Sequence, residues 1–145
     1  MSRATGTQDE RDSPYREYIL DVRIVAVDGE GDDGPRYRFE APNHEGRVFE
    51  NTDTAELYAD VYFDVNGFEE AGTGDRGVPP VIIAAGRDTL AAYLLTLPGT
   101  DRHWAASFFG VEPSQVQRYA DRVRHRAAEI REGALKRGVE STTRG

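Results

Sequence analysis

A glycine between two segments with helical spacing of apolar residues is the feature that most restricts how this chain can fold. We expect a first helix over about residues 102–109. Gly110 then supplies a left-handed turn residue, a conformation that a residue with a Cβ adopts only at a cost. A second helix is expected from Pro113, which suits a first helical turn, and it should run toward residue 134.

The residues around this glycine have the spacing of a known motif. Ala106 lies four residues before Gly110, where two closely crossing helices leave room only for a small side chain. Apolar residues flank the turn and recur three apart on the second helix: Phe109, Val111, Val116 and Tyr119. Over residues 78–131 the pattern resembles the helix-turn-helix of repressors and of sigma-factor-like three-helix domains. The helix expected before the pair would be its third, supporting helix.

The resemblance implies double-stranded DNA as the partner, with the second helix in the major groove. With the apolar positions inward, that helix presents to DNA the polar residues Ser114, Gln115, Gln117, Arg118, Asp121 and Arg122. Glutamine forms bidentate hydrogen bonds with adenine, and arginine does so with guanine. Phosphate contacts are expected from Arg102, Arg124 and Arg126. The expected function is that of a sequence-specific DNA-binding protein, a small transcriptional regulator working at high salt.

An alternative interpretation stays open from the sequence. Two helices around a turn are also a general way to pack helices, and a Gln/Arg face can be a solvated surface. Glu112 and Asp121 repel phosphate unless an arginine pairs with them. The chain would then be an acidic protein-interaction module without nucleic-acid binding, whose surface lies on the N-terminal hairpin and on the helix expected over 53–67.

The charge balance supports the first interpretation. The 145 residues include 26 acids and 18 bases, for a formal charge of −8, and Lys136 is the only lysine. This composition resembles that of proteins of halophilic archaea, in which dense surface carboxylates keep the chain hydrated; an ordinary acidic protein is the alternative. Residues 98–145 carry nine bases and six acids, a net charge of +3, whereas the remainder carries −11. The chain as a whole is similar to small helix-turn-helix proteins of those archaea.

The fold class expected is α+β. An N-terminal antiparallel hairpin or three-stranded sheet with a helix precedes the three-helix unit. Alternating apolar residues predict strands over 15–27, 37–41 and 47–51, with turns over 28–34 and 42–46. A helix capped by Thr52 or Asp53 should follow. Asn66–Gly67 should end it, with Phe68 folding back on its last turn.

A glycine-rich loop over 69–77 and a further helix over 78–97 are expected next. Gly86, inside this helix, costs about 1 kcal/mol relative to alanine. The buried side of the helix is predicted from its apolar residues, Ile83, Leu90, Tyr93, Leu94 and Leu97. The domains expected are a disordered tail, an acidic α+β module, the helix-turn-helix module and a second disordered tail, over residues 1–13, 14–77, 78–136 and 137–145.

The second helix of the motif carries a stripe of apolar residues with heptad-like spacing. Its members are Val116, Ala120, Val123, Ala127, Ile130 and Ala134. The stripe is either a seam for a homodimer through the C-terminal helix or a face that packs on the rest of its own domain. A dimer would match a two-fold DNA site.

The sequence offers no signal of catalysis. The absence of cysteine excludes disulfides, thiolate metal sites and a cysteine nucleophile. His44, His103 and His125 are not spaced as metal ligands, and no acid pair or nucleophile motif is present. We therefore expect no enzyme activity, no metal and no cofactor, and we expect Trp104 in the core. No signal peptide is recognisable and no apolar run approaches roughly 18 residues, so a cytoplasmic location without membrane contact is expected.

Overall fold

The computed structural model describes residues 12–27, 35–42, 44, 46–68 and 78–136. The predicted tails over 1–11 and 137–145, the turn over 28–34 and the loop over 69–77 lie outside these residues. The predicted end of the N-terminal tail is corrected. The N-terminal tail was expected to reach residue 13, but the first strand already starts at Asp12.

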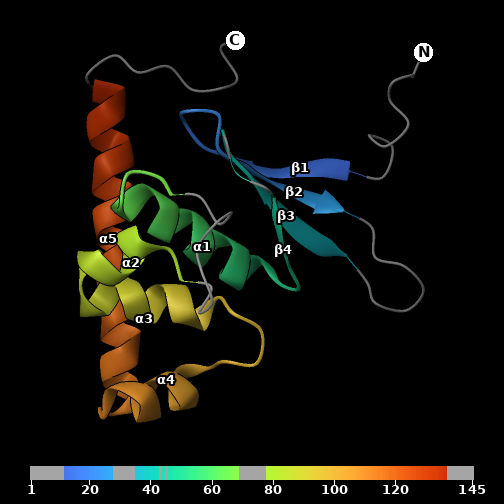
Figure 1. Cartoon of the computed structure of the whole chain (residues 1–145). Coiled ribbons are helices and arrows are strands. Elements are labelled where there is room, and N and C mark those ends of the chain that lie inside the picture. Colours follow the sequence, from blue (N-terminus) through green and yellow to red (C-terminus); the bar gives the residue numbers. More distant parts are fainter. Residues whose placement is uncertain (1–11, 28–34, 43, 45, 69–77, 137–145) are drawn as a thin grey trace, which may run out of the picture.

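Four strands form one antiparallel sheet with the order β1-β2-β3-β4 (Figure 1). They are β1 (Asp12–Glu17), β2 (Arg23–Val27), β3 (Arg36–Glu40) and β4 (Arg47–Phe49). The single strand predicted over 15–27 is wrong, because the chain reverses at Leu20 and Asp21, which both have φ of 63°. The Val22 amide donates to the Ile19 carbonyl across this turn at 3.4 Å. Positive φ at both central residues is the geometry of a type I′ hairpin.

The helix α1 (Thr52–Asp64) packs across β3 and β4. Its cap is Asn51, whose side-chain oxygen accepts from the Thr54 amide at 2.8 Å, and not the predicted Thr52 or Asp53. The predicted stop is confirmed, since Asn66 and Gly67 have φ of 64° and 97°. Phe68 is buried, and its ring lies 5.7 Å from the ring of Tyr62 in the last turn.

The helix expected over 78–97 is divided in two. α2 (Pro80–Ala85) and α3 (Arg87–Leu95) meet at Gly86, which has φ of 120° and ψ of 173°. This break changes which side of α2 faces inward. Ile82 is fully buried, whereas Ile83, predicted to be buried, is 55% exposed. The helical register of Leu90, Tyr93 and Leu94 therefore does not continue back through Gly86.

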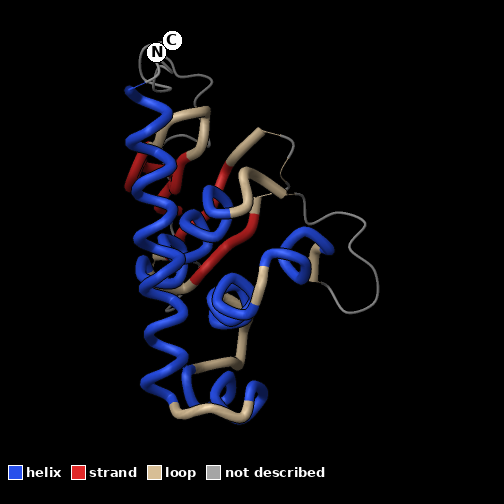
Figure 2. Tube along the Cα trace, turned by 90° about the vertical axis from the view of Figure 1, so that its left-hand side faces the viewer, coloured by secondary structure: helices blue, strands red, loops and turns tan. Residues whose placement is uncertain are grey.

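The helices α4 (Arg102–Phe109) and α5 (Pro113–Lys136) have the predicted bounds to within two residues. The molecule has three layers, in which α1 lies between the sheet and the helices α3 and α5 (Figure 1). Figure 2 shows α5 running along the length of the molecule. One buried cluster contains residues from every layer, among them Ile24, Phe39, Tyr58, Tyr93 and Val123. The two modules expected from the sequence thus share a core.

Most of the heptad-like stripe of α5 packs inside the molecule. Val116, Ala120, Val123, Ala127 and Ala134 are buried against the chain's own helices, and Ile130 is 36% exposed. The interpretation of the five buried members as a dimer seam is therefore wrong, since α1, α3 and α4 already cover them. The same contact fixes α5 to the rest of the molecule.

Arg126 of α5 links three helices by charge. Its Nε lies 2.7 Å from Asp64 Oδ1 of α1, and its Nη1 lies 2.8 Å from Asp88 Oδ2 of α3. The Thr89 hydroxyl donates to the other Asp64 oxygen at 2.7 Å. Burial by itself would raise the pKa of Asp88, but the hydrogen bond and charge of Arg126 outweigh it and lower that pKa. Arg126 was expected to contact phosphate, and the structure instead gives it this internal role.

We predict that Arg126→Ala lowers the free energy of unfolding by about 2 kcal/mol. This is less than the loss of about 3–5 kcal/mol typical of a broken buried pair, because the Arg126 side chain is 39% exposed and partly screened. The loss arises from the carboxylate of Asp64, which is 4% exposed and would lose its cation. Denaturant unfolding at neutral pH measures it.

Arg124→Ala is the matched control, because the ion pair of Arg124 with Asp121 lies on the surface of the same helix. A change within about 0.5 kcal/mol is expected for this variant.

The lowered pKa of Asp88 gives a stabilisation that is fully present when the pH is above the ordinary pKa of an aspartate. It is lost as the pH falls through the lowered pKa. The difference between Arg126→Ala and the native chain should therefore shrink in acid, and a constant difference would contradict the charge network.

Candidate nucleic-acid interface

The turn between α4 and α5 has the geometry expected from the sequence. Asp101 caps α4, and its carboxylate accepts from the Trp104 amide at 2.8 Å. Gly110 ends the helix in the left-handed conformation, with φ of 71° and ψ of 38°. The Val111 amide then donates to the Ala106 carbonyl at 2.9 Å, which closes the turn. α5 begins three residues after the glycine.

The two helices cross where small residues were predicted. Ala105 and Ala106 of α4 are 0% and 4% exposed, and with Val116 of α5 they form a small buried cluster. Leu95 of α3 packs against this cluster, so α3 is the supporting third helix. Beside the crossing, the rings of Phe109 and Tyr119 lie 6.1 Å apart. α3, α4 and α5 thus form a C-terminal helical unit that has the left-handed turn and the small-residue crossing expected from the sequence.

The residues predicted to face DNA lie together on the first three turns of α5. Ser114, Arg118 and Arg122 are exposed, and Gln115 and Gln117 are partly buried. This part of α5 and α4 form the end of the molecule farthest from the sheet (Figure 1). The predicted set is therefore gathered on one accessible helix surface.

Hydrogen bonds connect these side chains along the helix. Arg118 donates through Nη1 to Gln115 Oε1 at 2.7 Å. Gln117 donates to Asp121 Oδ1 at 3.0 Å, and Arg124 donates to the same oxygen at 3.2 Å. The negative charge of Asp121 is thus paired with an arginine, the condition under which an acid on this surface is compatible with phosphate nearby.

Two of the three arginines expected at phosphates, Arg102 and Arg124, are accessible at the surface. Arg102 is exposed in the first turn of α4. The Arg124 side chain is 40% exposed and pairs with Asp121. Arg126 is engaged with Asp64 and Asp88, as described above. The cationic part of the candidate interface is therefore smaller than the sequence indicated.

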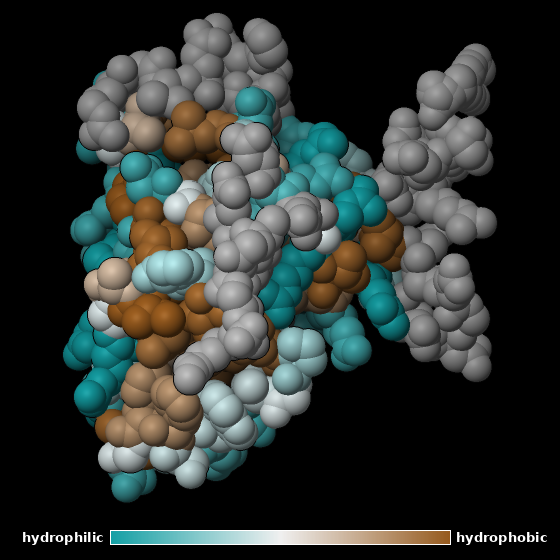
Figure 3. Space-filling model, viewed as in Figure 1, coloured by the Kyte–Doolittle hydropathy of each residue, from teal (hydrophilic) through white to brown (hydrophobic). Residues whose placement is uncertain are grey.

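Trp104 is not in the core as predicted. It is 42% exposed, and it stacks on Phe108, which is 59% exposed, with ring centroids 5.4 Å apart and an interplanar angle of 10°. Helical spacing within α4 could have indicated that Trp104 lies at the surface. Ala105, Ala106 and Phe109 face inward, so positions 104 and 108 fall beside the buried stripe. Figure 3 shows further hydrophobic side chains on the side of the molecule formed by α2, α3 and α4.

The described residues were also searched for a metal site and for a membrane-spanning helix. Within those ranges no group of three or more histidine, aspartate or glutamate side chains is placed to bind a metal ion. None of the helices described combines the length and the apolar character of a membrane-spanning segment. His44 lies among aromatic rings, and its Nε2 is 2.7 Å from the hydroxyl of Tyr58. His44 therefore packs in the aromatic core.

Comparison of the chain with protein-family models, with curated proteins and with solved structures gave no match. The assignment of the α3–α5 unit therefore rests on its own geometry.

We predict that Gly110→Ala lowers the free energy of unfolding by about 1 kcal/mol, because a Cβ is disfavoured at a φ of 71°. A steric clash is not the cause, since among the described residues no atom outside the adjoining backbone lies within 4 Å of the position a Cβ would take. Gly110→Asn is the matched variant, because asparagine tolerates the left-handed region better. Denaturant unfolding should rank glycine above asparagine above alanine. Equal stability of the three proteins would contradict a left-handed turn.

Proposed function

We propose that this protein binds double-stranded DNA in a sequence-specific manner and acts as a small transcriptional regulator at high salt. One observation carries the proposal. α4 and α5 cross at Ala106 and Val116 through a left-handed turn at Gly110, and this crossing leaves the polar face of α5 accessible. The major groove of B-DNA admits an α-helix with this kind of free face.

The order of side chains on α5 suits contact with bases. Ser114, Arg118 and Arg122 are spaced four apart, so they follow one another along a single side of the helix. Gln115 accepts from Arg118 and orients its guanidinium at the surface. An arginine presented in this way forms bidentate hydrogen bonds with the O6 and N7 of guanine. Arg118 is therefore the residue that we assign to base recognition.

The modest positive charge agrees with binding in concentrated salt. α5 carries six bases and three acids, and two of those bases, Arg126 and Arg131, form internal ion pairs. The counterion-release contribution of each phosphate contact falls steeply as salt rises. A DNA-binding protein in concentrated salt must therefore gain its affinity from base contacts and apolar burial, with few phosphate contacts.

The alternative, an acidic protein-interaction module, is weakened by the position of α1. This helix was expected to provide part of the interaction surface. It lies instead between the sheet and α3 and α5, and Tyr58, Ala59 and Val61 are fully buried on it. Deleting residues 101–145 is not a usable test, because it would remove α5 from the shared core. Single substitutions at the surface distinguish the two functions.

The test is selection of duplexes from a randomised library in about molar KCl, where screening suppresses nonspecific capture. We predict enrichment of a defined sequence. Fluorescence anisotropy on that sequence should show that Arg118→Ala weakens binding by about 1–3 kcal/mol, the cost of one bidentate base contact.

Lys136→Ala is the control for charge, since Lys136 is exposed at the opposite end of α5. It should bind the selected duplex like the native chain. Far-ultraviolet circular dichroism should show that both variants are folded. If no sequence is enriched by the folded protein, or if the two variants bind equally, the proposal is wrong.

A further inference from the structure

Arginines of the sheet and of α5 form ion pairs with acids. These are Arg16, Arg23, Arg38, Arg124, Arg126 and Arg131. A second group differs, because no acid lies within ion-pair distance of its members among the residues that the structure describes. This group consists of Arg87, Arg102, Arg118 and Arg122, and all four are exposed on α3, α4 or the first three turns of α5. In a chain with a net charge of −8, such a group of cations favours an anionic partner.

Two members of this group lie against an aromatic pair beside the α4–α5 turn. The Cζ atom of Arg87 is 5.8 Å from the ring centroid of Phe109. The Cζ atom of Arg122 is 5.9 Å from the ring centroid of Tyr119, and the two rings lie 6.1 Å apart. A guanidinium over a ring contacts it through its flat face, and the N–H groups at its edge stay available for hydrogen bonds. The aromatic pair therefore positions both arginines without using their donors.

A neighbouring ion pair indicates that both arginines lie on the same side of α5. Arg126 lies one turn after Arg122 on that helix. It binds Asp88, the residue next to Arg87 in the first turn of α3. This side of α5 therefore faces the start of α3. Arg118 lies one turn before Arg122, so the same surface continues to the residue that we assign to base recognition.

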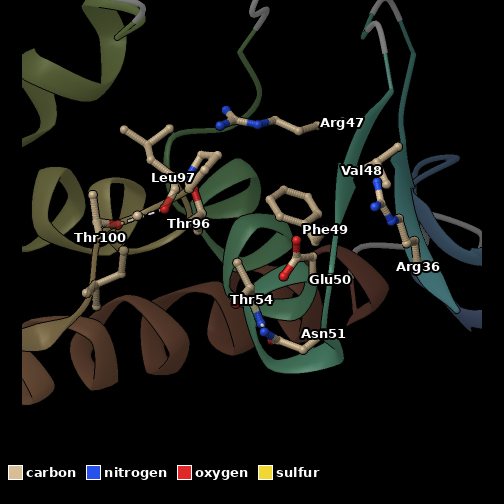
Figure 4. A pocket seen from close by; sticks show the side chains of 13 residues that line it. Arg36, Arg47, Val48, Phe49, Glu50, Asn51, Thr54, Thr96, Leu97 and Thr100 are labelled. Atoms are coloured by element: carbon tan, nitrogen blue, oxygen red, sulfur yellow. Dashed lines mark hydrogen bonds between the residues drawn. The ribbon is translucent and has the colours of Figure 1, made fainter. Parts of the chain in front are cut away.

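Hydrogen bonds in the connection between α3 and α4 hold the two helices together. The Thr100 hydroxyl donates to the Leu97 carbonyl at 2.9 Å (Figure 4), and the Thr96 hydroxyl donates to the Tyr93 carbonyl at 2.6 Å. This connection forms one wall of a pocket of about 460 Å³ opposite β4, and none of the four arginines lines that pocket. Since α3 also packs on α5, Arg87 has a fixed position relative to the polar face of α5.

We propose that Arg87 and Arg122 bind phosphates of the DNA backbone beside the groove that α5 enters. Arginine binds phosphate through charge-assisted, often bidentate hydrogen bonds. A phosphate contact from α3 sets the register and orientation of α5 on the duplex, so that Arg118 meets a base edge. This inference deepens the proposed function and rests on it. It adds two phosphate contacts, a number that agrees with binding in concentrated salt.

The test is fluorescence anisotropy of the full chain on the selected duplex and on an unrelated duplex of the same length, between about 0.2 and 2 M KCl. Each phosphate contact contributes about 0.9 to the slope of log K against log salt concentration. Arg87→Gln and Arg122→Gln should therefore each make the slope shallower by about 0.9. The advantage in affinity of the native chain then shrinks about eightfold across this range. Both duplexes should be affected alike, whereas Arg118→Ala should reduce the discrimination between them.

Two further variants separate a phosphate contact from other effects. Arg87→Lys keeps the charge and should keep the native slope. A purely structural role of Arg87 against Phe109 would instead lower stability and leave the slope of Arg87→Gln unchanged. Arg23→Gln is the matched control, because it removes the same charge from β2, where Arg23 pairs with Glu40. It should give the native slope, and circular dichroism at each salt concentration should show that every variant is folded.

Native affinity and native slope in both Arg87→Gln and Arg122→Gln would overturn the inference and leave the proposed function intact. An equal change of slope in Arg23→Gln would also overturn it, because the effect would then be one of net charge. If no sequence is enriched but binding of the unrelated duplex depends on Arg87, the sequence-specific function is refuted and the phosphate contact stands. Isothermal titration with inorganic phosphate separates the two sources of phosphate. Binding that depends on Arg87, without binding of any duplex, would overturn DNA as the ligand.

Discussion

The packing of α5 against α1 and α3 is the contact on which the rest of the structure depends. Small and β-branched side chains at Val116, Ala120, Val123 and Ala127 allow the helices to approach closely. Through α1 the same contact reaches the sheet, because α1 also packs across β3 and β4. Loss of this contact would separate the three layers. Only one face of α5 is used in the core, and its opposite face is accessible to solvent.

Ion pairs fix the orientation of α5 where apolar packing alone would leave it less defined. Arg126 joins Asp64 and Asp88, and Arg131 donates to Asp60 at 2.9 Å. Burial raises the pKa of Asp60 even though Arg131 donates to it, so the ion pair only partly compensates for the loss of solvation. Partly buried pairs are screened by salt much less than surface pairs. In an acidic chain such pairs retain their effect at salt concentrations that weaken surface interactions.

The way in which α4 and α5 are attached leaves the polar face of α5 accessible. The first turns of α5, which include Arg118, lie with α4 at the end of the molecule opposite the sheet (Figure 1). For the proposed function, the pairing of Arg124 with Asp121 leaves few net charges on α5, which would favour recognition of bases over attraction to the DNA backbone.

Features that depend on residues close together in the chain could be predicted before the fold was known. Gly110, Ala106 and Val116 predicted the α4–α5 crossing because a left-handed glycine and small residues at fixed spacing leave few alternatives. Tertiary structure decided the rest. The hairpin turn at Leu20 and Asp21 lacks the glycine or asparagine that signals positive φ. The pairing of Arg126 depends on Asp64 and Asp88, which are distant in sequence, and helical spacing cannot specify which buried carboxylate lies opposite an arginine.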